Sequence, residues 1–176
     1  FNFTILSATD LGLTEPDETE NSFIGNAVLK AKTAALASGT ASLADDSGLS
    51  VAALNGAPGV YSARWAGPNR DFNIAMKAVE EAFLKTQSDD TRAEFICALA
   101  LVWPDGHAVC VEGKIQGAIK FPARGTRGFG YDPIFQPHGH NISFGEMAPD
   151  IKHAISHRAD AFAKLISRCF NSNKDG

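Results

Sequence analysis

The sequence predicts an α/β fold in which a mixed, twisted β-sheet is flanked by helices. Three segments repeat apolar residues at the spacing of a helix, and short β-like runs lie between them. The run from Phe95 to Trp103 is apolar at nearly every position, which is typical of a strand covered on both faces. We therefore expect a central strand enclosed between helical layers.

Cap residues mark the ends of the three expected helices. The first helix follows the cap candidates Asn21 and Ser22 and ends near Gly39. The second starts at about Asp71, and the main part of the third follows Ser156. In each helix the apolar residues form one stripe, so each is expected to pack one face against the core.

The β-like runs cover residues 3–7, 42–44, 94–103, 108–119 and 131–135. Pro104, Asp105 and Gly106 form a tight turn between the third and fourth runs, which predicts an antiparallel hairpin. Because this hairpin lies within an otherwise alternating order of helices and strands, the sheet is expected to contain both parallel and antiparallel pairs.

The composition excludes several classes of protein. A chain of 176 residues with 44% hydrophobic and 20% charged residues fits one globular domain and is neither disordered nor fibrous. Its 20 acidic and 16 basic residues leave a net charge of -4, which gives no basic field for a nucleic-acid polymer. No apolar run approaches the roughly 20 residues of a membrane span, so no membrane association is expected.

The cysteines indicate a reducing compartment. Cys97, Cys110 and Cys169 are an odd number and include no Cys-x-x-Cys pair. This argues against a disulfide framework and against a thiolate zinc site. A cytoplasmic location is therefore expected.

Two groups of acidic residues are candidates for metal and acid–base chemistry. Asp45 and Asp46 are adjacent and precede Ser47, and adjacent side chains of an extended chain diverge. One carboxylate can then face a cleft while backbone donors hold the other, although a solvated turn is the plainer reading. Asp17 and Glu18 precede the first helix and either complement its dipole or supply a second carboxylate for Mg²⁺.

A second kind of pattern suits a heteroaromatic base. Phe129 and Tyr131 alternate with glycines beside Asp132, so a flat aromatic surface lies next to a hydrogen-bonding carboxylate. The alternative is a hairpin entry whose aromatic residues belong to the core.

Cationic and titratable groups gather at the start of the last helix. Lys152, His157 and Arg158 favour contacts to phosphate or base, and the alternative is a capped, basic helix start. His153 and His157 are four residues apart, but no third zinc ligand is evident, so a zinc site is disfavoured.

These segments, in this order, resemble the bacterial inosine triphosphate pyrophosphatases, also called noncanonical purine nucleoside triphosphate pyrophosphatases. The resemblance implies hydrolysis of ITP, dITP and XTP to the monophosphate and pyrophosphate, with Mg²⁺, or Mn²⁺ as the alternative ion. It also implies two lobes with a nucleotide-binding cleft between them, a homodimer, and removal of deaminated purines from the nucleotide pool. The matching motifs are Glu18–Thr19, Ser22–Phe23, Asn26–Ala27 with Lys30–Ala31, and residues 44–49, 56–64, 128–135 and 155–158.

The resemblance also implies roles for single residues. Asp46 matches the catalytic acid, which binds Mg²⁺ and orients or deprotonates the attacking water. The second acidic metal position falls at Asp17 or Glu18. The implied substrate contacts are Ser47, the base-binding residues Phe129, Gly130, Tyr131 and Asp132, and the further contacts Lys152, His157 and Arg158.

The match leaves rival hypotheses open. The family begins with a strand, a Thr/Ser-x-Asn-x-x-Lys phosphate loop and a helix, and this chain, expected to be one domain over residues 1–176, starts after them. A purine nucleotide-binding or sensing module without catalysis is therefore the alternative, and a pyrophosphatase for modified pyrimidine triphosphates is a third. The enzyme hypothesis requires that Asp46, residues 129–132 and the cationic turn at 157–158 converge on one pocket.

Overall fold

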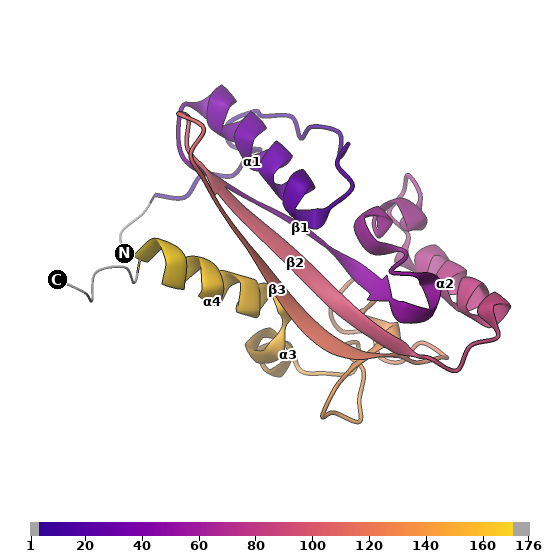
Figure 1. Ribbon diagram of the computed structural model, residues 1–176. Coiled ribbons are helices and arrows are strands. Elements are labelled where there is room, and N and C mark those ends of the chain that lie inside the picture. Colours follow the sequence, from indigo (N-terminus) through magenta and orange to yellow (C-terminus); the bar gives the residue numbers. More distant parts are fainter. Residues whose placement is uncertain (1–3, 171–176) are drawn as a thin grey trace.

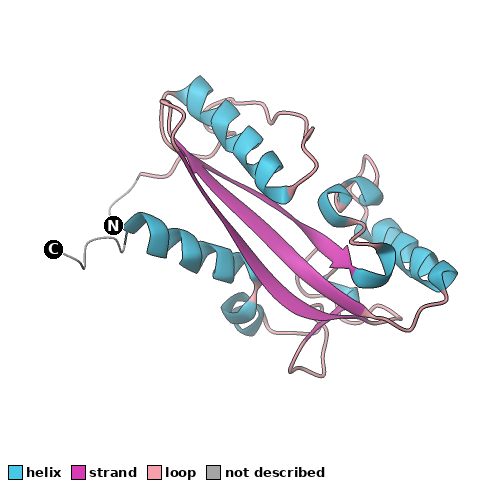
Figure 2. Ribbon diagram, viewed as in Figure 1, coloured by secondary structure: helices cyan, strands magenta, loops and turns pink. Residues whose placement is uncertain are grey.

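The computed structural model describes residues 4–170 and is built on one long, twisted sheet (Figures 1 and 2). Its strand order is β1-β2-β3-β4, and all three pairings are antiparallel. The strands are β1 (Ser42–Val51), β2 (Arg92–Val102), β3 (Ala108–Ile119) and β4 (Phe135–Pro137).

The α/β class is confirmed, but the described strands form no parallel pair. Val51 at the end of β1 is paired with Ala93 at the start of β2. The connection between them therefore leaves and re-enters the sheet at the same end, whereas a parallel pair would need a crossover along its whole length. Residues 4–7 of the first expected strand lie outside any helix or strand, and Phe3 lies outside the described residues.

The helices begin where the sequence predicts. The cap Ser22 accepts a hydrogen bond from the backbone of Gly25, and Asp71 accepts one from the backbone of Asn73. Ser156 likewise accepts a hydrogen bond from the backbone within the last helix. The helices are α1 (Phe23–Ser38), α2 (Phe72–Thr86), α3 (Pro149–Ile155) and α4 (His157–Phe170), with 3-10 turns η1 (Ala52–Leu54), η2 (Gly59–Tyr61), η3 (Arg64–Ala66) and η4 (Asp132–Ile134).

Alternation along β2 places α1 and α4 on opposite faces of the sheet (Figure 1). Ile96 and Ala98 pack in the cluster beneath α1, whereas Cys97 and Leu99 pack beneath α4. α2 lies at the other end of the sheet, where its apolar face joins a cluster containing Phe95. β2 is thus the central strand that its apolar sequence predicts.

Two glycines allow loops and helices to approach the sheet closely. A Cβ atom at Gly48 would lie 2.5 Å from the carbonyl oxygen of Gly59, so η2 packs directly on β1. A Cβ atom at Gly113 would lie 2.2 Å from the backbone of His157, so α4 begins directly on β3. Both contacts fix segments that carry candidate site residues.

No helix within residues 4–170 has both the length and the apolar character that crossing a membrane requires.

Candidate active site

Asp46 is buried on the face of β1 that carries α1. Asp46 is only 6% exposed. Lys30 and Asn26 of α1 contact its carboxylate. Lys30 Nζ donates to Oδ1 at 3.1 Å, and Asn26 Nδ2 donates to Oδ2 at 3.2 Å. Asn26 and Lys30 are four residues apart and therefore share one face of the helix. The expected backbone donors are replaced by these side-chain donors.

Lys30 also connects Asp46 to the segment before α1. Its Nζ lies 3.0 Å from Oε1 of Glu18 and 4.0 Å from Oε1 of Glu15, so three carboxylates surround one ammonium group, with Glu18 and Asp46 the nearest. Burial raises the pKa of Asp46, although Lys30 and Asn26 oppose this change. For Lys30, burial acts to lower the pKa, but the bonds to Glu18 and Asp46 outweigh it and raise the pKa.

The two carboxylates fit the donor set of Mg²⁺. Oxygens of Glu18 and Asp46 converge on one position, and Mg²⁺ in proteins commonly takes one or two carboxylates together with water and substrate phosphates. Asp17 is exposed on the cavity wall, whereas Glu18 binds the same Lys30 ammonium as Asp46, so the geometry favours Glu18. Residues 4–170 contain no group of three or more acidic, histidine or cysteine side chains placed to hold a metal by themselves.

Asp45 and Ser47 lie on the opposite face of β1. Ser47 Oγ donates to Oδ2 of Asp45 at 3.1 Å, and Nη2 of Arg158 lies 3.4 Å from the same oxygen. The divergence of the two aspartates, expected from the extended chain, is confirmed. One carboxylate is buried among donors beneath α1, and the other is exposed beside the start of α4.

The aromatic-glycine segment presents an exposed ring that has two cations over it. The exposed ring of Phe129 has Nζ of Lys152 4.7 Å and Cζ of Arg158 5.1 Å from its centroid. Buried Asp132 accepts hydrogen bonds from the backbone of Phe129, at 2.8 Å, and from Lys152. Gly128 is required here, because a Cβ atom would lie 2.0 Å from the Asp132 carboxylate. The segment presents a flat ring with hydrogen-bond donors beside it.

Tyr131 occupies the core rather than this surface. Its hydroxyl donates to the carbonyl oxygen of Ser62 at 2.8 Å, and its ring meets Phe72 edge-on at 5.4 Å. Burial raises the pKa of Tyr131. The core alternative thus describes the Tyr131 side chain, while Gly130, with φ of 65°, lies beside the ring of Phe72.

His157 is a buried, neutral residue that supports Arg158. Its ring stacks on Phe95 with centroids 4.9 Å apart, and its Nε2 lies 3.1 Å from Nη1 of Arg158. Because a guanidinium only donates, Nε2 is the acceptor and Nδ1 carries the proton. Burial, with the charges of Arg158 and Lys152, lowers the pKa of His157 to about 3. Nδ1 has no hydrogen-bond partner within the described chain.

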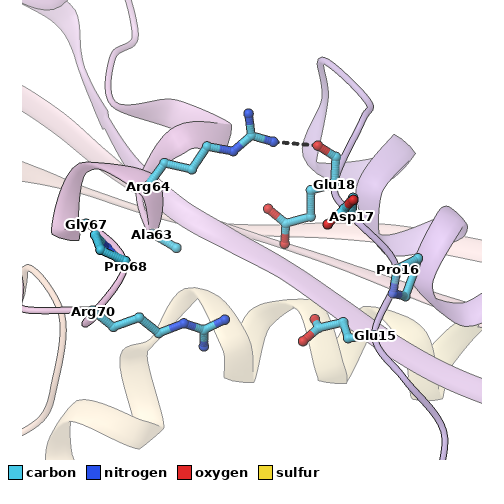
Figure 3. A pocket seen from close by; sticks show the side chains of 9 residues that line it. All are labelled: Glu15, Pro16, Asp17, Glu18, Ala63, Arg64, Gly67, Pro68 and Arg70. Carbon is cyan, nitrogen blue, oxygen red and sulfur yellow. Dashed lines mark hydrogen bonds between the residues drawn. The ribbon is translucent and has the colours of Figure 1, made fainter.

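The candidate residues form two clusters on either side of β1. The acidic cluster comprises Asp46 and Glu18, and the aromatic cluster comprises Phe129, Lys152 and Arg158. A 760 Å³ cavity is lined by Asp17 and Glu18 on one side and by Arg64 and Arg70 on the other (Figure 3). A 730 Å³ cavity on the other face is lined by Asp45, Arg158 and apolar residues of α4. Neither of these two cavities is lined by both Asp46 and Phe129, so the single pocket stays a prediction.

Sequence reasoning assigned no role to Asn26, Lys30 and Arg64, all of which contact the acidic cluster. The spacing of Asn26 and Lys30 on the predicted helix was the available signal. Arg64 donates to the carbonyl oxygen of Glu18 across 46 residues, and no local pattern indicates that bond.

A carboxylate pair on one face of β1 and an aromatic ring with two cations over it on the other face suit a nucleotide-hydrolysing α/β enzyme. The model of the Ham1 family matches residues 1–168, and the chain belongs to this family.

Relatives of the chain are similar over most of their length. A dITP/XTP pyrophosphatase of Caulobacter vibrioides is 62% identical, with 96% of this chain and 87% of that protein covered. Another, of Rhodospirillum centenum, is 60% identical over 93% of this chain and 81% of that protein. Among solved structures, a HAM1 protein from Coxiella burnetii superposes with a TM-score of 0.89 at 38% identity, covering 93% of this chain and 84% of that one. The Staphylococcus aureus Ham1 protein gives 0.86 at 34% identity, covering 94% and 85%.

The state of His157 predicts a loss of stability in mild acid. The unfolded chain takes up a proton at a pKa near 6.5, whereas the folded chain does so only at about 3. Stability therefore falls as the pH drops below 6.5, by about 2 kcal/mol at about pH 5. Urea denaturation at about pH 7.5 and about pH 5 measures this difference.

His157→Phe keeps a ring on Phe95 and should remove most of this pH dependence. His153→Gln, at an exposed histidine on α3, should leave it unchanged. Equal pH dependence in wild type and His157→Phe would contradict the neutral, buried state of His157.

Proposed function

We propose that this protein hydrolyses the noncanonical purine nucleoside triphosphates ITP, dITP and XTP to the monophosphate and pyrophosphate, with Mg²⁺ or Mn²⁺. This activity would remove deaminated purines from the nucleotide pool. The relatives named dITP/XTP pyrophosphatases support the substrate class. The observation that carries the chemistry is the convergence of the Asp46 and Glu18 carboxylates on one cationic position.

The acidic cluster is suited to attack on the α-phosphorus. Asp46 and Glu18 would hold the metal ion, which stabilises charge on phosphate oxygens and favours ionisation of a nearby water. The water oxygen forms a bond to the α-phosphorus, the bond to the pyrophosphate oxygen breaks, and Asp46 accepts the proton of the water. Lys30, which binds both carboxylates, supplies fixed positive charge beside them.

The aromatic cluster is suited to a 6-oxopurine. A base would stack on the exposed Phe129 ring in place of a cation that now lies over it, and Arg158 and Lys152 would supply hydrogen-bond donors to the base. These groups can donate hydrogen bonds to the 6-oxygen of a 6-oxopurine. The 6-amino group of adenine would leave the donors unpaired, at a cost of about 1–3 kcal/mol. Asp132 is occupied by Lys152 and the Phe129 backbone, so its role is to position both groups.

The position of β1 supports a single ligand reaching both clusters. Adjacent residues of β1 face the two clusters, because Asp46 lies on the α1 side and Asp45 and Ser47 lie on the α4 side. A nucleotide that spans β1 at Asp45–Ser47 therefore has its base on the α4 side and its phosphates on the α1 side. Ser47 would contact the ligand at the crossing point.

Homodimerisation and a cytoplasmic location remain proposals from the family resemblance. Size-exclusion chromatography with light scattering, read against the 18.7 kDa of one chain, measures the first of them.

Asp46→Asn should abolish turnover while the fold persists. The amide keeps the size of the side chain but removes the charge that binds the metal and accepts the proton, so kcat should fall by about a thousandfold. A coupled assay for pyrophosphate, with calorimetric binding of ITP and a thermal melt, measures the three properties separately.

Asp45→Asn is the matched control, because the same change one residue away lies on the other face of β1. Its kcat should change far less than that of Asp46→Asn, and any effect should fall on KM, because Asp45 binds Arg158 and Ser47. Unchanged kcat in Asp46→Asn, or release of orthophosphate in place of pyrophosphate, would refute the proposed reaction. Binding of ITP without turnover in wild type would instead favour a nucleotide-sensing module.

Phe129→Ala should weaken binding of the base without disabling the chemistry. Loss of one stacking surface is worth about 1–3 kcal/mol, so KM for ITP should rise by about tenfold and kcat should change much less. Steady-state kinetics at saturating Mg²⁺ measures both. An unchanged KM would remove Phe129 from the base site.

A further inference from the structure

The acidic loop, residues 15–20, has no regular secondary structure that could place its carboxylates. Within the described chain it precedes α1 as an extended segment. α1 holds one side of it: Lys30 binds the Glu18 carboxylate at 3.0 Å, and Asn26 Oδ1 accepts a hydrogen bond from the Glu20 backbone at 3.0 Å. The position of the Glu18 carboxylate thus depends on contacts from other elements.

Arg64 holds the loop from the opposite side. Its Nη2 donates to the main-chain carbonyl oxygen of Glu18, and Figure 3 shows this bond spanning one end of the 760 Å³ cavity. The guanidinium lies over the ring of Tyr61, 5.0 Å from its centroid, which restricts its orientation. Glu18 is therefore fixed at its carboxylate by α1 and at its backbone by η3.

The acceptor chosen by Arg64 is informative. Glu15, Asp17 and Glu18 all line the same cavity, and a guanidinium ordinarily forms its strongest bonds with carboxylates. Arg64 binds a carbonyl oxygen instead, and so leaves the Glu18 carboxylate directed at Lys30 and Asp46. The bond anchors the loop without occupying the group that meets Asp46.

We propose that Arg64 is a positioning residue that fixes the Glu18 backbone so that the carboxylates of Glu18 and Asp46 share one divalent cation. This inference rests on the proposed function for the presence of that cation. Partners that orient a metal-binding carboxylate commonly change metal affinity by about 10- to 100-fold when they are removed. Because the Arg64 bond is exposed, the lower end of this range applies.

Arg70 provides a matched control. It lines the same cavity and carries the same charge, and Figure 3 shows it directed toward Glu15. Its guanidinium makes no hydrogen bond or ion pair with residues 4–170. Arg64→Gln and Arg70→Gln therefore remove the same charge from the same cavity, but only the first removes a bond to the acidic loop.

The decisive measurement is Mn²⁺ binding without nucleotide, followed by electron paramagnetic resonance of the free ion. Arg64→Gln should weaken binding about tenfold, and Arg70→Gln should change it little. Hydrogen–deuterium exchange should accelerate at residues 15–20 in Arg64→Gln alone. In the pyrophosphate assay, the metal concentration for half-maximal rate should rise in Arg64→Gln, while kcat at saturating metal stays near wild type.

Two results would overturn the inference: wild-type Mn²⁺ affinity in Arg64→Gln, or an equal loss in both variants, which would show that charge alone matters. If Arg64→Gln does not fold, Arg64→Lys keeps the charge with poorer reach, and its Mn²⁺ affinity must lie measurably below wild type. If wild type releases no pyrophosphate yet Arg64→Gln weakens Mn²⁺ binding, the proposed function fails and the positioning role stands. If wild type releases pyrophosphate and Arg64→Gln binds Mn²⁺ as wild type does, the positioning role is refuted and the proposed function stands.

Discussion

The ammonium group of Lys30 is the contact on which the acidic half of the molecule depends. A buried carboxylate such as Asp46 is costly unless a partner compensates its charge, and Lys30 supplies that partner while also binding Glu18. The alanine stripe of α1 makes this possible, because small side chains such as Ala27 and Ala31 let the helix lie close to the sheet. The packing of α1 on the sheet therefore determines both the charge compensation of Asp46 and the position of the segment before α1.

Local signals in the sequence were sufficient for the helices and the hairpin. Caps such as Ser22 and Asp71 satisfy backbone donors within their own turn, so their effect is readable without knowledge of the fold. Strand direction was not readable in the same way. The antiparallel pairing of β1 with β2 requires the connection over residues 52–91 to return to the same end of the sheet. No local sequence pattern in that connection indicates this return.

The candidate site was predictable in its residue types and only partly in its geometry. Alternation along a strand is a local rule, so the divergence of Asp45 and Asp46 followed from the sequence. The burial of His157 against Phe95 joins residues 62 positions apart and has no local signature. For the same reason the sequence could not distinguish the exposed ring of Phe129 from the core ring of Tyr131, two residues away.

Ser62 gives the two halves of the site a common support. Its Oγ accepts a hydrogen bond from the Leu49 backbone on β1, and its carbonyl oxygen accepts one from Tyr131. Two residues further on, Arg64 reaches Glu18. A short turn thus touches the edge strand, the aromatic segment and the acidic segment in succession. Any shift of that turn would therefore displace β1, the aromatic segment and the acidic segment together.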